Sequence, residues 1–125
     1  MENFTEIFAR FRQFLDSMSL LRRVGSTFAR IDILAGSVVD FEGDAIVNAA
    51  NEGCTGGFGV DEVINKAGGF ALKEARKALG GCSTGHAKIT PSFNHEKVKW
   101  IIHAVGPVYR IPFGCNLSSE EVSEL

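Results

Sequence analysis

The residues with the most chemical potential stand between Asp44 and Gly69, in the stretch DAIVNAANEGCTGGFGVDEVINKAGG. A short apolar run leads into a glycine-rich loop, and a helical pattern begins directly after it at Val60. Such a loop suits phosphate, because few side chains shield its backbone N–H groups and the positive end of the helix dipole adds to their field. The N–H donors would belong to Gly56, Gly57, Phe58 and Gly59. The stretch therefore predicts an anion site, with a purely structural turn as the alternative.

Three polar side chains flank the glycine-rich loop. Asn48 and Asn51 can hold ribose hydroxyls, because a carboxamide both donates and accepts hydrogen bonds. Asp61 lies in the first turn of the following helix, where a carboxylate interacts favourably with the helix dipole. The same carboxylate can instead position a hydroxyl or a water molecule beside a bound phosphate.

Other familiar sites do not fit the sequence. A Walker A loop ends in Gly-Lys-Ser/Thr, whereas Gly59 is followed by Val60 and Asp61, and Glu62 stands where a Rossmann motif requires glycine. The scattered histidines fit structural roles better than catalysis: His86, His95 and His103. The cysteines form no CxxC pair and are expected to be free thiols: Cys54, Cys82 and Cys115. We therefore expect no metal and no cofactor, and an intracellular location, cytoplasmic or nuclear.

The composition is that of an ordinary globular domain. The chain has 125 residues, of which 45% are hydrophobic and 22% charged, and this length fits one domain. With 13 basic and 15 acidic residues the net charge is −2, which argues against general nucleic-acid binding. No apolar run approaches the roughly 20 residues that span a bilayer, so we expect no membrane insertion. The acidic N-terminal segment also lacks the features of a secretory or transit peptide.

Hydrophobic spacing predicts the elements that position the loop. Residues 3–23 carry apolar side chains at three- and four-residue intervals and are predicted to form an amphipathic helix. Strands are predicted at 28–35, 45–47, 87–90 and 98–105, the second of them buried as in a parallel sheet covered on both faces. Residues 48–59 are predicted to be irregular, followed by helices at 60–67 and 70–79 that are separated by Gly68-Gly69. Strands that alternate with helices predict a layered α/β fold.

Three blocks of the sequence together resemble the macro domain family, the ADP-ribose-binding module. They read DAIVNAANEGCTGGFGVDEVINKAGG, CSTGHAKITPSF and WIIHAVGPVYR, keep the family's order and spacing, and lie within residues 28–110. NAAN followed by GVD at this spacing is a specific signal. The resemblance implies a three-layer α/β/α fold with a mixed sheet. It also places the chain near the hydrolase-like branch, which releases mono-ADP-ribose from protein side chains.

The resemblance assigns roles by position. Asn51 matches the asparagine that contacts the distal ribose of ADP-ribose, and Asp61 matches the aspartate that orients that ribose or an attacking water. Residues 56–59 match the first diphosphate loop. The remaining implied contacts with the ligand belong to Ser37, Val38, Ile46, Val47, Asn48 and Val60.

The chain departs from the family at two positions and in its length. Ser37 stands where the family has an aspartate that holds the adenine amino group, so we expect weaker adenine selectivity. Phe58 occupies a loop position that is usually small. The family continues well beyond the HAVGP strand, with a second phosphate loop, whereas here residues 118–121 look like a capping box and the sequence stops soon afterwards. We therefore expect a helical extension at 1–25 and a partial macro domain at 26–125.

Three functional interpretations remain open. The chain belongs to an enzyme that removes ADP-ribose from proteins through Asn51 and Asp61, or to a binding module without turnover, or it is a truncated, inactive product. The presence of both Asn51 and Asp61 favours hydrolysis in a complete domain. The missing C-terminal part predicts that the chain alone is poorly stable and inactive. The expected partner is ADP-ribose or a mono-ADP-ribosylated protein, and neither nucleic acid nor a membrane.

Overall fold

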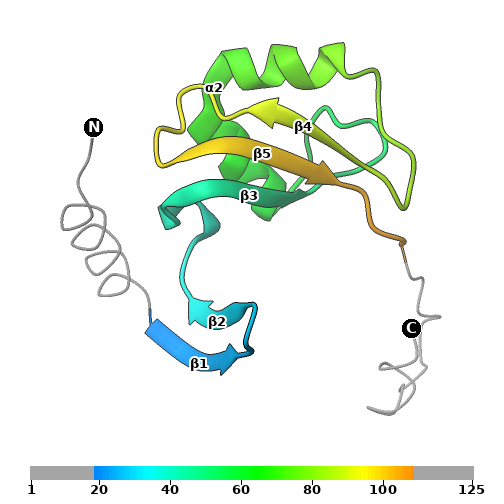
Figure 1. Cartoon of the computed structure of the whole chain (residues 1–125). Coiled ribbons are helices and arrows are strands. Elements are labelled where there is room, and N and C mark those ends of the chain that lie inside the picture. The colour runs from blue at the N-terminus through cyan, green and yellow to red at the C-terminus, as the bar shows by residue number, and fades with distance from the viewer. Residues whose placement is uncertain (1–18, 109–125) are drawn as a thin grey trace, which may run out of the picture.

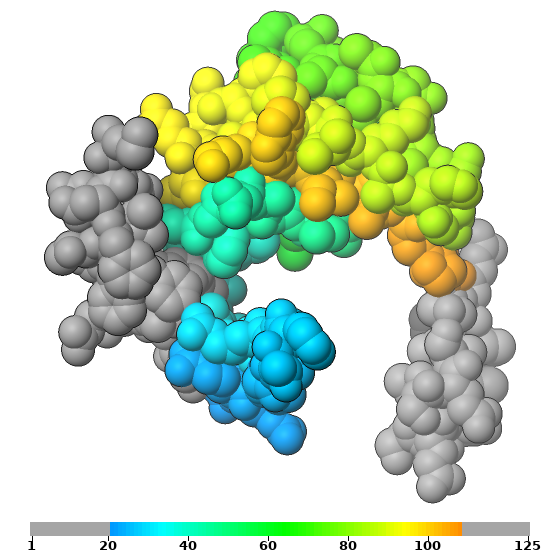
Figure 2. Space-filling model, in the orientation of Figure 1, coloured from blue at the N-terminus to red at the C-terminus, as the bar shows by residue number. Residues whose placement is uncertain are grey.

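A computed structural model describes residues 19–108 and contains two β-structures, a hairpin and a mixed three-stranded sheet (Figure 1). The hairpin consists of β1 (Ser19–Gly25) and β2 (Arg30–Ala35), which pair antiparallel. The space-filling view shows this hairpin standing away from the three-stranded sheet (Figure 2).

The hairpin corrects the prediction of a helix up to residue 23. Residues 19–23 belong to β1, and Arg23 lies directly opposite Asp32 of β2. The Nε of Arg23 donates to Oδ1 of Asp32 at 2.8 Å, and this hydrogen bond lowers the pKa of the Asp32 carboxyl. Pairing with β2 satisfies the backbone of this segment, which local helical spacing alone could not reveal. The helix predicted for residues 3–18 lies outside the described residues, as do Cys115 and the capping box at 118–121.

The sheet combines parallel and antiparallel pairs, as the mixed sheet of the sequence prediction requires. Its strands are β3 (Gly43–Ala49), β4 (Ala87–Pro91) and β5 (Val98–Ala104), in the order β3-β5-β4. β3 runs parallel to β5, and β4 runs antiparallel to β5. The strands predicted in these three places and at β2 are confirmed. The carboxyl ends of β3 and β5 consequently meet at one edge of the sheet.

The burial predicted for residues 45–47 is only half right. Ile46 is 4% exposed, but Val47 on the opposite face is 58% exposed. Side chains alternate across a strand, and among residues 19–108 the covering helix lies on the face that holds Ile46 (Figure 1). The strand itself is confirmed, whereas the prediction that Val47 is buried is wrong. Asn48 and Ala49, predicted to be irregular, are the last two residues of this strand.

The helix α2 (Val60–Ala78) covers this face and is bent into two segments at Gly69 (Figure 1). Gly69 has φ 73° and ψ −162°, a combination that only glycine adopts readily. The two helices predicted on either side of Gly68-Gly69 are therefore confirmed as two arms of one kinked element. Gly80 and Gly81 both have positive φ and end the second arm, as predicted.

Both arms of α2 pack on one core. Ile64 comes from the first arm and Leu72 from the second, and both are fully buried together with Ile46, Val98 and Ile101 of the sheet. The short 3-10 helix η1 (Val38–Asp40) packs against the same cluster through Val38 and Val39. No helix within residues 19–108 is long and apolar enough to cross a membrane.

We expect Gly69→Ala to lower the free energy of unfolding by about 1–3 kcal/mol, because the kink needs a backbone conformation that alanine avoids. A Cβ at Gly69 would also lie 2.8 Å from Nδ2 of Asn94. Urea unfolding measures the loss, with Gly25→Ala as control, since a Cβ at Gly25 meets no atom within 4 Å. Equal stability of the two variants would contradict a strained kink.

Candidate functional site

A groove of about 600 Å³ opens at the edge where β3 and β5 end. Its lining includes the following polar and loop residues: Asn51, Glu52, Gly57, Phe58, Asp61 and Thr84. Ligands of open α/β sheets bind at the carboxyl ends of parallel strands. The groove therefore brings four of the expected site residues together: Asn51, Gly57, Phe58 and Asp61.

The glycine-rich loop between β3 and α2 is braced from inside. Nδ2 of Asn51 donates to the carbonyl oxygen of Gly56 at 2.8 Å, and the backbone N–H of Cys54 donates to the Asn51 carbonyl at 3.0 Å. Gly56 and Gly59 both have positive φ, and Gly59 is the N-cap of α2. Asn51 therefore fixes the loop with its amide nitrogen. Its side-chain oxygen makes no described contact with the loop.

Gly57 lies directly over the Asp61 carboxylate. A Cβ at Gly57 would stand 3.0 Å from Oδ2 of Asp61, which is closer than ordinary side-chain contacts. Glycine at this position therefore lets the loop backbone approach the carboxylate and any ligand above it. Phe58, next in the loop, is 95% exposed beside the groove.

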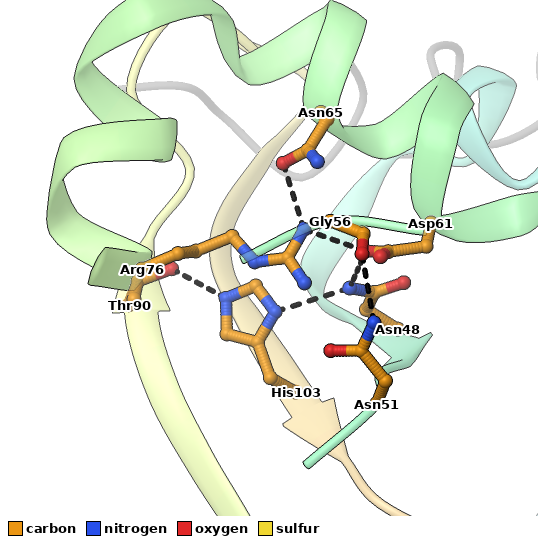
Figure 3. Close-up of polar contacts among 8 residues, drawn as sticks. All are labelled: Asn48, Asn51, Gly56, Asp61, Asn65, Arg76, Thr90 and His103. Atoms are coloured by element: carbon orange, nitrogen blue, oxygen red, sulfur yellow. Dashed lines mark hydrogen bonds and ion pairs between the residues drawn. The ribbon is translucent and has the colours of Figure 1, made fainter. Parts of the chain in front are cut away.

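Asp61 is buried and one of its two oxygens is fully engaged (Figure 3). Oδ1 accepts hydrogen bonds from Nδ2 of Asn48 and from Nη1 of Arg76, both at 2.6 Å. The Arg76 guanidinium is wholly buried and also donates to Oδ1 of Asn65 at 2.7 Å. Within residues 19–108, Oδ2 of Asp61 has no hydrogen-bond partner. One carboxylate oxygen is thus held in place and the other is left beneath the loop.

A chain of buried polar groups extends from Asp61 across the sheet (Figure 3). Asn48 Nδ2 lies 3.1 Å from Nδ1 of His103, and Nε2 of His103 lies 3.0 Å from Oγ1 of Thr90. An amide nitrogen can only donate, so Nδ1 of His103 is the acceptor and Nε2 carries the proton. Burial lowers the pKa of His103 to about 4, so the imidazole is neutral at pH 7. The chain therefore fixes the orientation of the Asn48 amide.

The other expected contact residues lie away from the groove or behind it. Asn48 is fully buried between Asp61 and His103, and Ile46 is in the core under α2. Ser37 is the N-cap of η1 and makes no side-chain cap hydrogen bond, and Val38 packs on the core. Val60 begins α2 and is 45% exposed. None of these residues lines the groove, and their contacts with a ligand stay predictions.

Sequence reasoning missed Arg76 and the link between Glu52 and Thr84. Arg76 follows Leu72 by one helical turn and so shares its buried face, and a charged residue on an apolar face was the available signal. The Glu52 carboxylate accepts hydrogen bonds from Oγ1 and the backbone N–H of Thr84, at 2.7 and 3.0 Å. These hydrogen bonds lower the pKa of Glu52 and tie together two loops that line the groove.

The described cysteines are buried and take no part in a metal-binding group. Cys54 and Cys82 are free, buried thiols that pack with Val105, and burial raises the pKa of Cys54. Within residues 19–108 no three His, Cys, Asp or Glu side chains are grouped so that they could hold a metal ion.

Comparison with known proteins identifies one family. Residues 47–123 match the Macro domain family model. A macro domain-containing protein of Caldanaerobacter subterraneus is 52% identical over 85 residues, which cover 65% of this chain and 48% of that protein. The O-acetyl-ADP-ribose deacetylase of Salmonella newport is 45% identical over 86 residues, which cover 66% and 48%. The chain thus spans about half the length of these curated relatives.

Solved structures show the same fold. The Oceanobacillus iheyensis macrodomain with MES bound has a TM-score of 0.67 at 30% identity, covering 73% of this chain and 51% of that chain. The Trypanosoma brucei macrodomain in complex with ADP-ribose has a TM-score of 0.53 at 41% identity, covering 58% and 31%.

The buried His103 should make stability fall in mild acid. Its pKa is about 4 in the fold against 6.5 ordinarily, so between these values the unfolded chain binds a proton that the folded chain does not. Stability is therefore full above about pH 6.5 and declines toward pH 4, by up to about 3 kcal/mol. Urea unfolding of the wild type and His103→Gln at pH 7 and pH 4.5 measures this difference.

The variant should lose less stability than the wild type over that interval. His86→Gln is the matched control, because His86 is exposed and should leave the wild-type decline unchanged. A wild type and a His103→Gln variant with the same decline would show that His103 is not the group responsible.

Proposed function

Because the chain belongs to the macro domain family, we propose that its groove binds ADP-ribose, either free or attached to a protein. The observation that carries this proposal is the meeting of an open glycine loop and a buried carboxylate, with one oxygen unpartnered among residues 19–108, at a single groove. Such a site offers backbone donors to a diphosphate, with a carboxylate directly beneath them. The Trypanosoma brucei macrodomain, similar in fold, is known in complex with ADP-ribose.

The diphosphate would lie on residues 56–59. Gly57 has no side chain to keep a phosphate at a distance, and the first arm of α2 begins immediately after Gly59. The helix dipole and the loop N–H groups both favour an anion at this point. Within this proposal Asn51 and Asp61 stand on the distal-ribose side of the groove.

We further propose hydrolysis of mono-ADP-ribose from protein side chains when this groove is joined to the remainder of a macro domain. The Asp61 carboxylate would orient a ribose hydroxyl or the attacking water, while Asn48 and Arg76 keep it from turning. Catalysis of this kind rests on positioning more than on a strong acid or base. The Salmonella relative, named an O-acetyl-ADP-ribose deacetylase, also supports an enzymatic role.

Binding is tested by placing a side chain in the loop. Gly57→Glu should weaken ADP-ribose binding by at least about ten-fold, roughly 1.4 kcal/mol. The added carboxylate repels the diphosphate, and its Cβ meets Oδ2 of Asp61 at 3.0 Å. Gly25→Glu adds the same charge in open space at the end of β1 and should bind like the wild type. Calorimetry with equal affinities for the wild type and Gly57→Glu would rule out this placement of the diphosphate.

Turnover is tested in two proteins. The 125-residue chain is expected to release no ADP-ribose from a mono-ADP-ribosylated protein. A fusion of this chain to the C-terminal half of the Oceanobacillus macrodomain should release it. Asp61→Asn in the fusion should slow release by at least about a hundred-fold, because the neutral amide cannot orient water as a carboxylate does.

The fusion carrying Glu62→Gln is the control, since Glu62 neighbours Asp61 in sequence but pairs with Lys66 in an exposed ion pair. A fusion that binds ADP-ribose without releasing it would point to the alternative function, a binding module.

A further inference from the structure

The most unusual group near the groove is the buried ion pair of Asp61 and Arg76. Arg76 is fully buried, and its side chain has no exposed surface through which water could screen its charge. Nη1 donates hydrogen bonds to both Asp61 and Asn65, whereas within residues 19–108 Nε and Nη2 have no hydrogen-bond partner. An arginine that uses so few of its five donors is poorly explained by hydrogen bonding alone. Its charge is the property that this position uses.

The kink at Gly69 lies between Asp61 and Arg76 in the sequence and makes the contact of their side chains possible. Asp61 and Arg76 belong to opposite arms of α2, and in a straight helix fifteen residues would separate their backbones by about 22 Å. In the kinked helix their side chains meet at 2.6 Å. The fold thus delivers a positive charge from the far arm to the base of the loop.

The location of the pair matters for an anionic ligand. Oδ2 of Asp61 lies within 3.0 Å of the place that a Cβ on Gly57 would take. A lone carboxylate there would face the diphosphate across the loop backbone, and in a poorly screened site the repulsion between them would be strong. Nη1 of Arg76 lies 2.6 Å from Oδ1 of Asp61, and its positive charge reduces this repulsion.

We propose that Arg76 is a positioning residue that sets the affinity of the groove for the anionic part of its ligand. It neutralises Asp61 beneath the diphosphate loop and holds Oδ1 of that carboxylate in place. This inference rests on the proposed function and extends it to the balance of charge between Asp61 and Arg76 beneath the loop. Its consequence is that affinity for a diphosphate follows the net charge of the pair, whereas affinity for an uncharged nucleoside does not.

The test compares ADP with adenosine, two ligands that differ in the diphosphate and both lack the distal ribose. Calorimetry on the full chain gives the ratio of the two affinities for the wild type, Arg76→Met, Asp61→Asn and the double variant. The pair then carries a net charge of about 0, −1, +1 and 0, respectively. We expect the ratio to fall by at least about ten-fold in Arg76→Met, to rise in Asp61→Asn, and to return to within about three-fold of the wild type in the double variant.

Arg76→Lys keeps the charge and should retain most of the ratio. Lys77→Met is the matched control, because it removes a neighbouring positive charge that is exposed and paired with Glu74. Thermal melts identify any variant that does not fold. If Arg76→Met does not fold, Asp61→Asn and the double variant still test whether the affinity ratio follows the charge of the pair. The double variant lacks both charged partners.

Failure of the inference and failure of the proposed function look different. A wild-type chain that binds neither ADP-ribose nor ADP overturns the proposed function and this inference with it. A wild-type chain that binds both, with a ratio that does not follow the charge of the pair, overturns the inference alone. Equal losses for ADP and adenosine in Arg76→Met would show that Arg76 supports only the structure.

Discussion

The geometry of the site depends on the ion pair between Asp61 and Arg76, which is buried beneath the glycine-rich loop. Burying two charges is expensive and is tolerated only when the partners satisfy each other closely. Asp61 and Arg76 can meet only if the second arm of α2 folds back on the first, and Gly69 supplies the backbone conformation for that turn. The kink, the pair and the loop above them therefore form one unit. A change at Gly69 should reach the groove through Arg76, although Gly69 is not among the residues that line it.

The same unit is anchored to every strand of the sheet. Asn48 comes from β3, His103 from β5 and Thr90 from β4, and their hydrogen bonds connect the Asp61 carboxylate to all three strands (Figure 3). Each buried polar group in such a chain limits the orientation of the next. A neutral His103 is required for this arrangement, because a protonated ring could not accept from Asn48. Burial supplies that condition by lowering the pKa of His103.

The three-stranded sheet has one covered face and one open face within the described residues. Ile46 and its neighbours pack under α2, while Val47, Ile89 and Trp100 are about half exposed on the other side. The groove lies at the end of the strands, and its loop and its carboxylate belong to residues 19–108. The parallel pairing of β3 and β5 brings Asn51 and Val105 to the same edge.

The sequence by itself determined most of the local elements and the position of the glycine-rich loop. Glycine spacing located the loop and both arms of α2, since glycine conformations and helix ends are local properties. The positions of Asn51 and Asp61 relative to that loop placed both residues at the groove. The apolar runs located β2, β3, β4 and β5, but their alternation could not show that Val47 faces away from the helix. A run of three apolar residues looks the same in a strand covered on one face or on two.

Only the tertiary structure decided which groups Asp61 meets. Arg76 is fifteen residues away along the chain and His103 is farther still, and no local pattern couples them to the carboxylate. Residues 19–23 form a strand for the same reason, because pairing with β2 is a contact outside the segment that local spacing describes. Helical periodicity reports only neighbours within a few turns, whereas a buried charge is placed by whatever the fold brings against it. The position of the loop could therefore be predicted from the sequence, and the charge pair beneath it could not.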